Sequence, residues 1–374
     1  MYSFDIIIVG GGLAGLTAAI HLKMHGYHVA VFEPKQYPHH KVCGEYVSNE
    51  VLPYMAFLGI SLPKTYQINQ MLFSTTTGSM VKANLPMGGF GLSRYAFDEV
   101  LYKRAIALGV LVIHENVSSI WFDQDSFRVS AQLGGKYSSK FVIGAYGKRG
   151  ALDRELQRNF TFKKSPWLGV KAHYKLDSFP ANLVAVHNFR GGYGGLSKTE
   201  SGVVNLCYLV SYDSFKKEKN VDSFNQNVLA QNPYLNEFLN DAEMLFDQPL
   251  AIGQISFHKK KPVENHMLMC GDTAGLIHPL CGNGMAMAIH SAKIASESIH
   301  NYYRINALDR RQMEKDYEGQ WRHMFTRRLL MGRLLQSALL NQKISNIAMR
   351  ILAKSPHMLH MLIRNTHGRK IMGQ

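Results

Sequence analysis

The feature that most constrains this chain is a glycine-rich turn between an apolar run and a helix-forming segment near its start. Residues 4–9 carry the β-branched and apolar side chains of a strand buried on both faces, and Gly10-Gly11-Gly12-Leu13-Ala14-Gly15 follows directly. Residues 16–22 favour a helix, Gly26 stands where that helix would end, and residues 27–32 return to a strand pattern. This order predicts a βαβ unit, and with it an α/β protein.

The spacing of these glycines is that of a dinucleotide-binding turn. Gly10 permits a sharp turn, Gly12 lets a phosphate approach the backbone, and Gly15 lets helix and strand pack closely. The free N–H groups of Leu13 and Ala14 at the helix start suit a pyrophosphate. Glu33 follows the second strand, where its carboxylate can accept both hydroxyls of an adenosine ribose. An acidic residue there disfavours a 2′-phosphate, so NADP is not expected in this site.

A second motif far along the chain indicates which dinucleotide is bound. Cys270-Gly271-Asp272-Thr273-Ala274-Gly275 and Gly282-Asn283-Gly284-Met285 have the pattern strand, carboxylate, glycine-rich loop and helix. Asp272 can bind a sugar-alcohol hydroxyl such as those of the ribityl chain of a flavin. A helix start near Gly284 and Met285 can face the flavin pyrimidine and stabilise the reduced ring. A plain NAD dehydrogenase has no use for this second site, so the two motifs together predict FAD.

On these motifs, together with Leu92-Ser93-Arg94 before a predicted helix, the chain resembles FAD enzymes of the para-hydroxybenzoate hydroxylase fold. The segments Lys41-Val42-Cys43-Gly44-Glu45-Tyr46-Val47-Ser48, Gly147-Lys148-Arg149 and Gly191-Gly192-Tyr193-Gly194-Gly195-Leu196 resemble the geranylgeranyl reductase-like branch of that group. The resemblance implies that Arg94 contacts the ribityl–pyrophosphate region of FAD and that Val117 meets the adenine through its backbone.

The expected fold class is an FAD-binding Rossmann-like domain of three ββα layers, with an inserted antiparallel β-sheet substrate domain and a helical C-terminal region. The FAD-binding domain is expected to be discontinuous, comprising residues 1–65, 90–165 and 250–300. The substrate domain would comprise residues 66–89 and 166–249, and residues 301–374 would form the helical region.

Departures from known patterns narrow the chemistry. Flavin halogenases carry a Trp-x-Trp-x-Ile-Pro stretch, whereas Trp121, Trp167 and Trp321 are far apart here. Aromatic hydroxylases usually carry an Asp-Gly pair where this chain has Tyr146-Gly147, which weakens an NADPH-driven hydroxylase. Archaeal geranylgeranyl reductases carry a Tyr-x-Trp-x-Phe-Pro motif, of which Tyr193 alone is kept, so the lipid pocket should differ in detail.

Cys43 and Tyr193 are the catalytic candidates, as groups beside the isoalloxazine. An inert buried thiol is the alternative for Cys43. The glycines at 191, 192, 194 and 195 indicate a turn, either beside a ligand or in a simple hairpin. His278 is expected to shape the loop at the flavin edge. His39-His40 has no ligand companions, and no metal site is expected.

Three functions stay open from these residues. The first is reduction of carbon–carbon double bonds in a prenyl, lipid or carrier-bound hydrophobic substrate by hydride transfer from reduced FAD, which needs a dry apolar pocket and a proton donor. The second is FAD-dependent hydroxylation of a lipophilic phenol or polyketide. The third is a non-catalytic carrier of prenyl ligands. NADH or NADPH is an open candidate for the electron donor.

Charge is concentrated at the C-terminal end. The whole chain has 42 Lys and Arg against 27 Asp and Glu, a formal charge of +15. From residue 301 on there are 14 Lys and Arg and 4 Asp and Glu, a net of +10, with no acid after Glu318. Leucines interleave with these arginines at helical spacing. The pattern suits an anionic membrane, a diphosphate or an acidic acyl carrier protein, with a solvated helix packed on the body as the alternative. No nucleic-acid reader motif accompanies it.

The cysteine count and the start of the chain bear on the compartment. Four dispersed cysteines in 374 residues do not form a disulfide framework, which favours a reducing compartment. The first residues lack a secretory signal pattern, and no uncharged apolar run approaches the roughly 20 residues that a spanning helix needs. A cytoplasmic protein, or one peripheral to a membrane, is expected.

Overall fold

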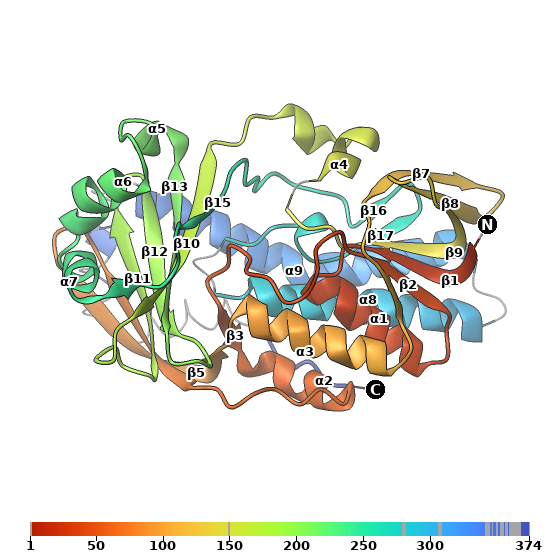
Figure 1. The fold of residues 1–374 in the computed structure, drawn as a ribbon, viewed down its shortest axis with the longest axis horizontal. Helices are drawn as coiled ribbons and strands as arrows, with labels where there is room; N and C mark the ends of the chain where they lie inside the picture. Colours follow the sequence, from red (N-terminus) through yellow and green to blue (C-terminus); the bar gives the residue numbers. More distant parts are fainter. Residues whose placement is uncertain are drawn as a thin grey trace.

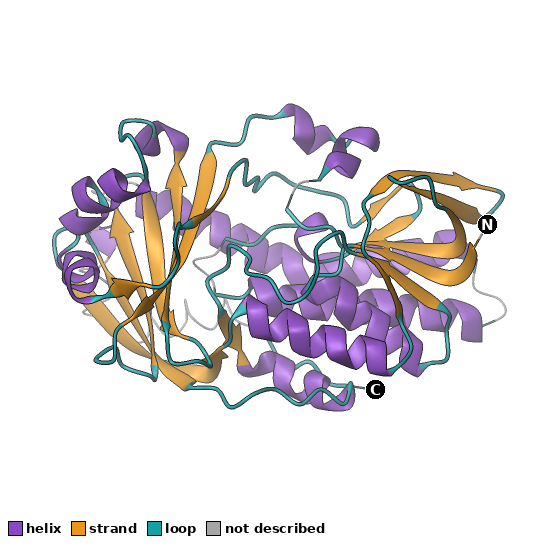
Figure 2. Ribbon diagram, viewed as in Figure 1, coloured by secondary structure: helices purple, strands orange, loops and turns teal. Residues whose placement is uncertain are grey.

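A computed structural model describes residues 2–148, 150–278, 282–305, 309–340 and 368–373, together with residues 345, 347, 348, 351, 355 and 358. Two β-sheets lie at opposite ends of the longest axis of the molecule, and long helices pack beside the sheet that contains the N-terminal strand (Figures 1 and 2). The chain crosses between the two sheets several times, so each sheet is built from segments that are far apart in sequence.

The first sheet has a parallel centre. Its strands are β1 (Tyr2–Val9), β2 (Val29–Phe32), β6 (Leu111–Ile113), β9 (Lys136–Gly144), β16 (Val263–Glu264) and β17 (Met267–Met269), in the order β16-β17-β9-β1-β2-β6. The pairs β1–β2, β1–β9, β2–β6 and β9–β17 are parallel. Ile6, Ile7 and Ile8 are fully buried, because helices cover one face of this sheet and a β-layer covers the other.

The two outer layers come from different parts of the chain. Helices α1 (Leu13–Met24), α3 (Arg94–Ala107) and α8 (Gly284–Arg304) cover one face, and α1 contacts both of the others. Strands β7 (Val117–Asp123) and β8 (Ser126–Ala131) extend from β9 as an antiparallel meander on the other side (Figure 2). The arrangement is the expected ββα sandwich, and it places the start of α1 at the carboxyl end of β1, where ligands bind in such sheets.

The second sheet is mainly antiparallel. Its strands are β3 (Tyr46–Ser48), β4 (Gln67–Ser74), β5 (Met80–Gly91), β10 (Trp167–Lys175), β11 (Leu183–Phe189), β12 (Gly192–Lys198), β13 (Val204–Ser211), β14 (Glu243–Met244) and β15 (Leu250–Ile252). The order is β14-β10-β13-β12-β11-β4-β5-β3, with β15 paired to β10, and only β4–β11 is parallel. Strands β3 and β15 come from segments that we expected in the FAD-binding domain.

Short helices cover the outer face of the second sheet. They are α5 (Tyr212–Phe215), α6 (Val221–Asn227) and α7 (Pro233–Asp241). Phe224, Leu235 and Phe238 from α6 and α7 pack against sheet residues such as Tyr208 in a separate apolar core. Because this face is sealed, the opposite face of the sheet is the one that can meet the first sheet and a ligand.

The remaining helices are α2 (Leu52–Phe57), α4 (Ala151–Glu155) and the long α9 (Arg310–Leu340), which packs along α8. The Tyr317 hydroxyl on α9 donates to the Met269 carbonyl, and Ile371 N donates to the Glu50 carbonyl at 2.8 Å, so the C-terminal segment folds back onto the body. The predicted fold class is confirmed. No helix within the described ranges is long and apolar enough to span a bilayer.

Candidate functional site

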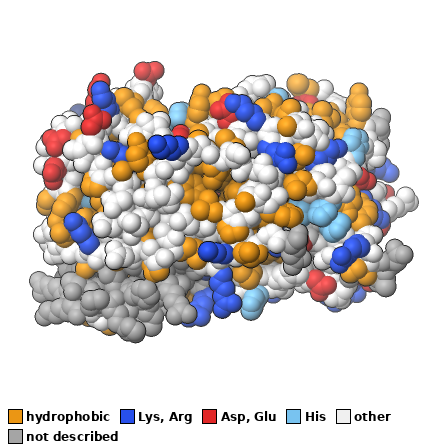
Figure 3. All heavy atoms as spheres, turned by 90° about the horizontal axis from the view of Figure 1, so that it is seen from below, with side chains coloured by type: hydrophobic (Ala, Val, Ile, Leu, Met, Phe, Trp, Pro, Cys, Tyr) orange, Lys and Arg blue, Asp and Glu red, His pale blue; other side chains and the backbone are white. Residues whose placement is uncertain are grey.

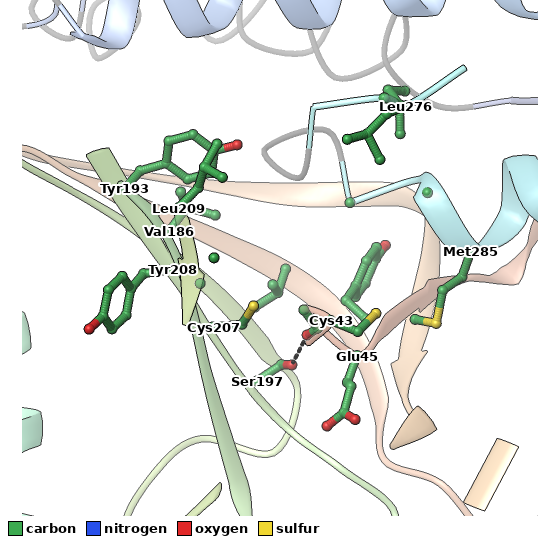
Figure 4. Close-up of a pocket in the computed structure, with 18 of the residues that line it drawn as sticks. Cys43, Glu45, Val186, Tyr193, Ser197, Cys207, Tyr208, Leu209, Leu276 and Met285 are labelled. Carbon is green, nitrogen blue, oxygen red and sulfur yellow. Dashed lines mark hydrogen bonds between the residues drawn. The ribbon is translucent and has the colours of Figure 1, made fainter. Parts of the chain in front are cut away.

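A cavity of about 590 Å³ lies between the two sheets, and both sequence motifs line it. Leu13 and Ala14 border it from the first motif, and Asp272 and Met285 border it from the second. A Cβ atom placed on Gly271 would lie 3.2 Å from the Ala14 Cβ, so the two stretches are in contact. Figure 4 shows this space, with Met285 on one side and the second sheet on the other.

Two helix N-termini point at the cavity without a side-chain cap. Helix α1 begins after Gly12 and helix α8 begins after Asn283, neither with a capping hydrogen bond from a side chain or an acid in the first turn. Gly12 and Gly284 both line the cavity. Uncapped N–H groups carry partial positive charge, so each terminus suits an anionic or electron-rich part of a ligand. The turn before α1 requires glycine at position 10, because its φ of 106° is left-handed and a Cβ would overlap the Ala145 carbonyl.

A pair of cations stands beside the first helix start. Arg94 donates from Nε and Nη2 to the Asp98 carboxylate, both at 2.8 Å, and Lys41 Nζ lies 2.9 Å from the same group. Burial alone would raise the pKa of Asp98, but the charges and hydrogen bonds of Arg94 and Lys41 hold this pKa below its usual range. A Cβ on Gly12 would lie 3.5 Å from Arg94 Nη2. The cluster therefore keeps one net positive charge against the glycine turn, where a pyrophosphate would bind.

Glu33 lies against the other side of the glycine turn. Its Oε2 accepts from Gly11 N at 3.0 Å and its Oε1 accepts from Lys35 N at 3.2 Å. The Tyr37 hydroxyl donates to the Gly11 carbonyl, and the Tyr37 ring stacks on Tyr102 with centroids 4.4 Å apart. This places a carboxylate and an aromatic wall where the ribose of a dinucleotide would lie. Val117 begins β7 and is buried outside the cavity lining, so its contact with adenine stays a prediction.

The loop that carries Cys43 is held by two strands of the second sheet and by the loop that follows β9. Lys148 Nζ donates to the Val42 carbonyl at 3.2 Å, and Asn205 Nδ2 donates to the Cys43 carbonyl at 3.1 Å. Ser197 Oγ donates to the Gly44 carbonyl at 3.4 Å, the bond dashed in Figure 4. Three successive carbonyls are thus bound by side chains from separate elements. The loop forms a fixed wall, and the Cys43 side chain stands in that wall beside the cavity.

The next residue, Glu45, turns its carboxylate away from the cavity (Figure 4). Its backbone φ of 57° is left-handed, which is uncommon for a residue other than glycine. Its Oε1 accepts from Arg94 N at 2.8 Å and from Lys171 Nζ at 2.5 Å, and its Oε2 lies 2.7 Å from His173 Nε2. Burial would raise the pKa of Glu45, but His173 and Lys171 outweigh burial and hold this pKa below its usual range.

Sequence reasoning did not select Glu45, Lys171 or His173 as functional residues. A signal was present in β10, where Lys171 and His173 interrupt an otherwise apolar run before the terminal Lys175. Alternation places Lys171 and His173 on the same face of that strand, and both are buried. A buried lysine with a buried histidine on the same face requires a hydrogen-bonding or charged partner.

The far wall of the cavity is apolar. Tyr193, Val186 and Leu209 from the second sheet line it, with Tyr193 buried among Leu209, Ile255 and Leu276 (Figure 4). The expectation that residues 192–195 form a turn is wrong. They are the start of strand β12, because they pair with both β11 and β13. Only Gly191, with φ of 85°, lies in the turn. Cys207 also lines the cavity, and burial raises the pKa of its thiol to about 12.

Two further residues from the sequence lie outside the cavity lining. His278 is buried with its ring stacked on Phe257 at 3.6 Å, and burial with the charge of Arg333 lowers its pKa to about 3, so it is neutral at ordinary pH. The Tyr146 hydroxyl donates to Asp153 at 3.0 Å, in an ion pair with Arg158. Residues 279–281, which complete the second motif, lie outside the described residues. Among the described residues no group of three His, Cys, Asp or Glu is placed to hold a metal ion.

The fold and the site define a flavoprotein that holds FAD between a Rossmann-like sheet and a second sheet. Residues 3–312 match the family model described as "FAD binding domain", and the chain belongs to this family. The prediction that the cofactor is FAD is thereby confirmed. The residues fit the group, because two uncapped helix starts and Arg94 of the cationic cluster line the connected space. The Glu33 carboxylate is bound to the glycine turn beside it.

The relatives carry out several reactions. A digeranylgeranylglycerophospholipid reductase of Methanosarcina acetivorans is 23% identical over 368 residues, covering 91% of this chain and 86% of that protein. A flavin-dependent halogenase of Armillaria mellea is 21% identical over 355 residues, covering 82% and 69%. A probable FAD-dependent monooxygenase of Pseudomonas aeruginosa has a similar structure, with a TM-score of 0.74, 14% identity and coverage of 91% and 98%. At 14% identity, the similarity to the monooxygenase structure establishes a shared fold and not a shared reaction.

Proposed function

We propose that this FAD-dependent flavoenzyme reduces carbon–carbon double bonds of a hydrophobic substrate of the prenyl or lipid class. The proposal rests on the shape of the cavity, which is continuous from the cofactor motifs to the apolar face of the second sheet. Its lining there includes Met71, Phe73, Val81, Val184 and Val186. Such a wall suits an aliphatic chain and offers few partners to a polar substrate.

Reduction of an alkene needs a hydride on one carbon and a proton on the other. Bound FAD in its reduced form supplies the hydride. The chain must then exclude water and hold a proton beside the substrate. Tyr193 is buried in the cavity wall, and the Cys207 thiol keeps its proton at neutral pH because its pKa is about 12. Cys43 stands in the loop opposite. These three groups are our candidates for orienting the alkene and delivering the proton.

Halogenation is less well supported by the residues of the site. Trp121 lies exposed on β7, Trp167 begins β10 and Trp321 is buried on α9, and none of them lines the cavity. The Tyr146 side chain, at the position where hydroxylases of this fold carry Asp, is bound to Asp153 instead of facing the cofactor space. The similar structure of a monooxygenase keeps hydroxylation as the second candidate.

One experiment separates these candidates. The purified holoprotein is reduced with dithionite and incubated without oxygen with a lipid extract, and products are identified by mass spectrometry. A lipid that gains two hydrogen atoms per double bond supports the reductase. A product that gains one oxygen atom only in air, with NADPH consumption stimulated by a phenol, supports the monooxygenase and refutes the reductase. A protein that purifies colourless and does not take up FAD would favour a non-catalytic prenyl carrier.

A further inference from the structure

We propose that the second half of α9 and the outer end of the cavity form a membrane-docking face, through which a lipid enters directly from an anionic bilayer. We define the docking face as Leu330, Leu334, Ile347, Ile351 and Met358 with Arg322, Arg327 and Arg333. The identity of the entering molecule rests on the proposed function, whereas the binding of a lipid surface can be tested without it.

Helix α9 changes character along its length. In its first half Tyr317, Trp321 and Phe325 are buried against the body, as expected of a helix with one apolar stripe. In its second half one side, with Leu335 and Leu339, lines the main cavity. Leu330 and Leu334 on another side are 49% and 56% exposed. A single helix therefore forms part of the cavity wall and also presents leucines to solvent.

The apolar surface continues from the cavity to the outside. Ile351 and Met358 line the cavity, yet they are 48% and 45% exposed. Ile347 beside them in sequence is 59% exposed. Side chains that belong both to the lining and to the surface mark a mouth of the cavity. A mouth rimmed by aliphatic side chains would face water at a cost, and contact with lipid removes that cost.

Charge around the exposed leucines favours an anionic surface as the partner. Arg322, at the end of the first half of α9, and Arg327 and Arg333, in its second half, are exposed, and no acid follows Glu318 in the sequence. Glu318 itself is paired with Arg322 at 2.6 Å. Arg333 makes no ion pair within the described part of the chain. Arginines interleaved with leucines on one helix are typical of segments that lie in a membrane interface.

A second cavity provides space for a headgroup beside this helix. It measures about 230 Å³ and is lined by Lys259, Arg322, Arg333 and Thr326, with Trp321 as an apolar wall. Leu276 lines both cavities, so they lie on either side of one loop. Lys260 also lines this recess, with its Nζ donating to the Lys148 and Asp272 carbonyls. Four cationic side chains around a small recess suit a lipid phosphate. On the face drawn in Figure 3, hydrophobic side chains also gather near the middle of the molecule, with Lys and Arg side chains close by.

The test uses the full-length holoprotein and vesicles. Sedimentation is measured with phosphatidylcholine vesicles and with vesicles that also contain phosphatidylglycerol, at low and high salt. We expect binding at least about tenfold stronger to the anionic vesicles, weakened by salt. The Leu330→Glu/Leu334→Glu variant should lose most of this binding, and Arg327→Gln/Arg333→Gln should lose the preference for phosphatidylglycerol.

A matched control separates docking from a general effect of added charge. Leu133 is 88% exposed in the turn between β8 and β9 of the first sheet, and it is not part of the docking face. Leu133→Glu should therefore bind vesicles like the parent protein. FAD absorbance and circular dichroism show whether each variant is folded. Equal binding to neutral and anionic vesicles would overturn the proposal, as would unchanged binding by the folded leucine variant or binding to an acidic carrier protein in place of vesicles.

The two proposals fail in different ways. If the leucine variant still reduces a short, water-soluble alkene but not a long-chain alkene held in vesicles, and the parent protein reduces both, both proposals stand. If the parent protein ignores vesicles but reduces the soluble alkene, docking is wrong and the proposed function is kept. If the parent binds anionic vesicles and reduces no alkene, docking is kept and the proposed reaction is wrong.

Discussion

Glu45 shows how much of this site depends on single buried charges. One carboxylate joins the start of α3 through Arg94 N and the second sheet through Lys171 and His173. The same residue follows Cys43 and Gly44 in the cavity wall, so its position sets theirs. We infer that Glu45 is a positioning residue, because its carboxylate points away from the cavity.

Glu45→Gln should destabilise the protein by about 3–5 kcal/mol, because it leaves the buried Lys171 without its counter-charge. Urea unfolding at neutral pH measures this, and Glu155→Gln, at an exposed position in α4, is the control. Adding Lys171→Met to Glu45→Gln should restore part of the loss. A Glu45→Gln protein as stable as the parent would contradict the role of this cluster.

The Glu45 carboxylate should also make part of the folding stability sensitive to acid. The pKa of Glu45 in the folded protein lies below its ordinary value of 4.5, so its ionised form contributes stability above pH 4.5. This contribution is lost as the pH falls below 4.5 towards the folded pKa. Unfolding measured across that acidic range should show a steeper loss in the parent than in Glu45→Gln. Equal slopes would show that the carboxylate does not titrate as described.

Asp272→Ala should purify with little or no yellow colour, since Asp272 lines the cavity at the second motif and is expected to bind the ribityl chain. Absorbance of bound flavin per protein and FAD titration by fluorescence measure the loss. Asp241→Ala, at the exposed end of α7, should retain full colour. An Asp272→Ala protein that is fully loaded with FAD would remove this residue from the cofactor site.

At the scale of elements, residues 368–373 and α9 both contact one buried residue, Glu50. Glu50 is fully buried, Arg328 of α9 lies 3.7 Å from it, and the Ile371 N–H binds its carbonyl. Burial raises the pKa of Glu50 to about 7, although Arg328 acts in the opposite direction. The protonation state of this group is therefore linked to the packing of two distant elements.

The pH dependence of stability that Glu50 contributes is opposite in sign to that of Glu45, because folding raises the pKa of Glu50 and lowers that of Glu45. The folded protein holds the Glu50 proton more tightly than the unfolded chain, so the contribution is fully present below pH 4.5 and is lost as the pH rises through about 7. The parent should lose up to about 3 kcal/mol over this window from this group. Glu50→Gln should remove this part of the pH dependence in urea unfolding, and a Glu50→Gln protein with the parent's slope would contradict the assignment.

At the scale of the whole molecule, the space between the sheets determines what the protein can bind. Gly195 on β12 lines this space, and a Cβ there would have its nearest neighbour at 3.8 Å, so a larger side chain can be added without moving the backbone. Gly195→Val should keep FAD and reduce turnover of a long substrate by about tenfold or more.

Turnover of substrates of increasing length, with bound FAD measured in parallel, tests this expectation. Gly319→Val, on the exposed side of α9 with open space around it, is the control. Unchanged turnover of long substrates by a loaded Gly195→Val protein would show that the substrate does not use this wall.

The sequence alone determined the class of this protein because its strongest signals are local. The turn at Gly10–Gly15 and the acid at Glu33 follow from backbone geometry within one βαβ unit. The position of Asp272 at the end of a strand was also readable from neighbouring residues. Sequence periodicity could not identify β12 as a strand, because its glycines hide the alternation that identifies strands.

Only the tertiary structure decided which distant residues meet. Glu45 and His173 are 128 positions apart, and their contact depends on how the second sheet aligns against the first. The approach of Lys41 to the Arg94–Asp98 pair of α3 also depends on tertiary packing. The placement of Tyr193 and Cys207 in one wall follows from the register of β12 and β13, and the exposure of Leu330 and Leu334 follows from the packing of α9. Local propensity acts over a few residues, whereas these contacts are fixed by sheet register and helix packing across the whole chain.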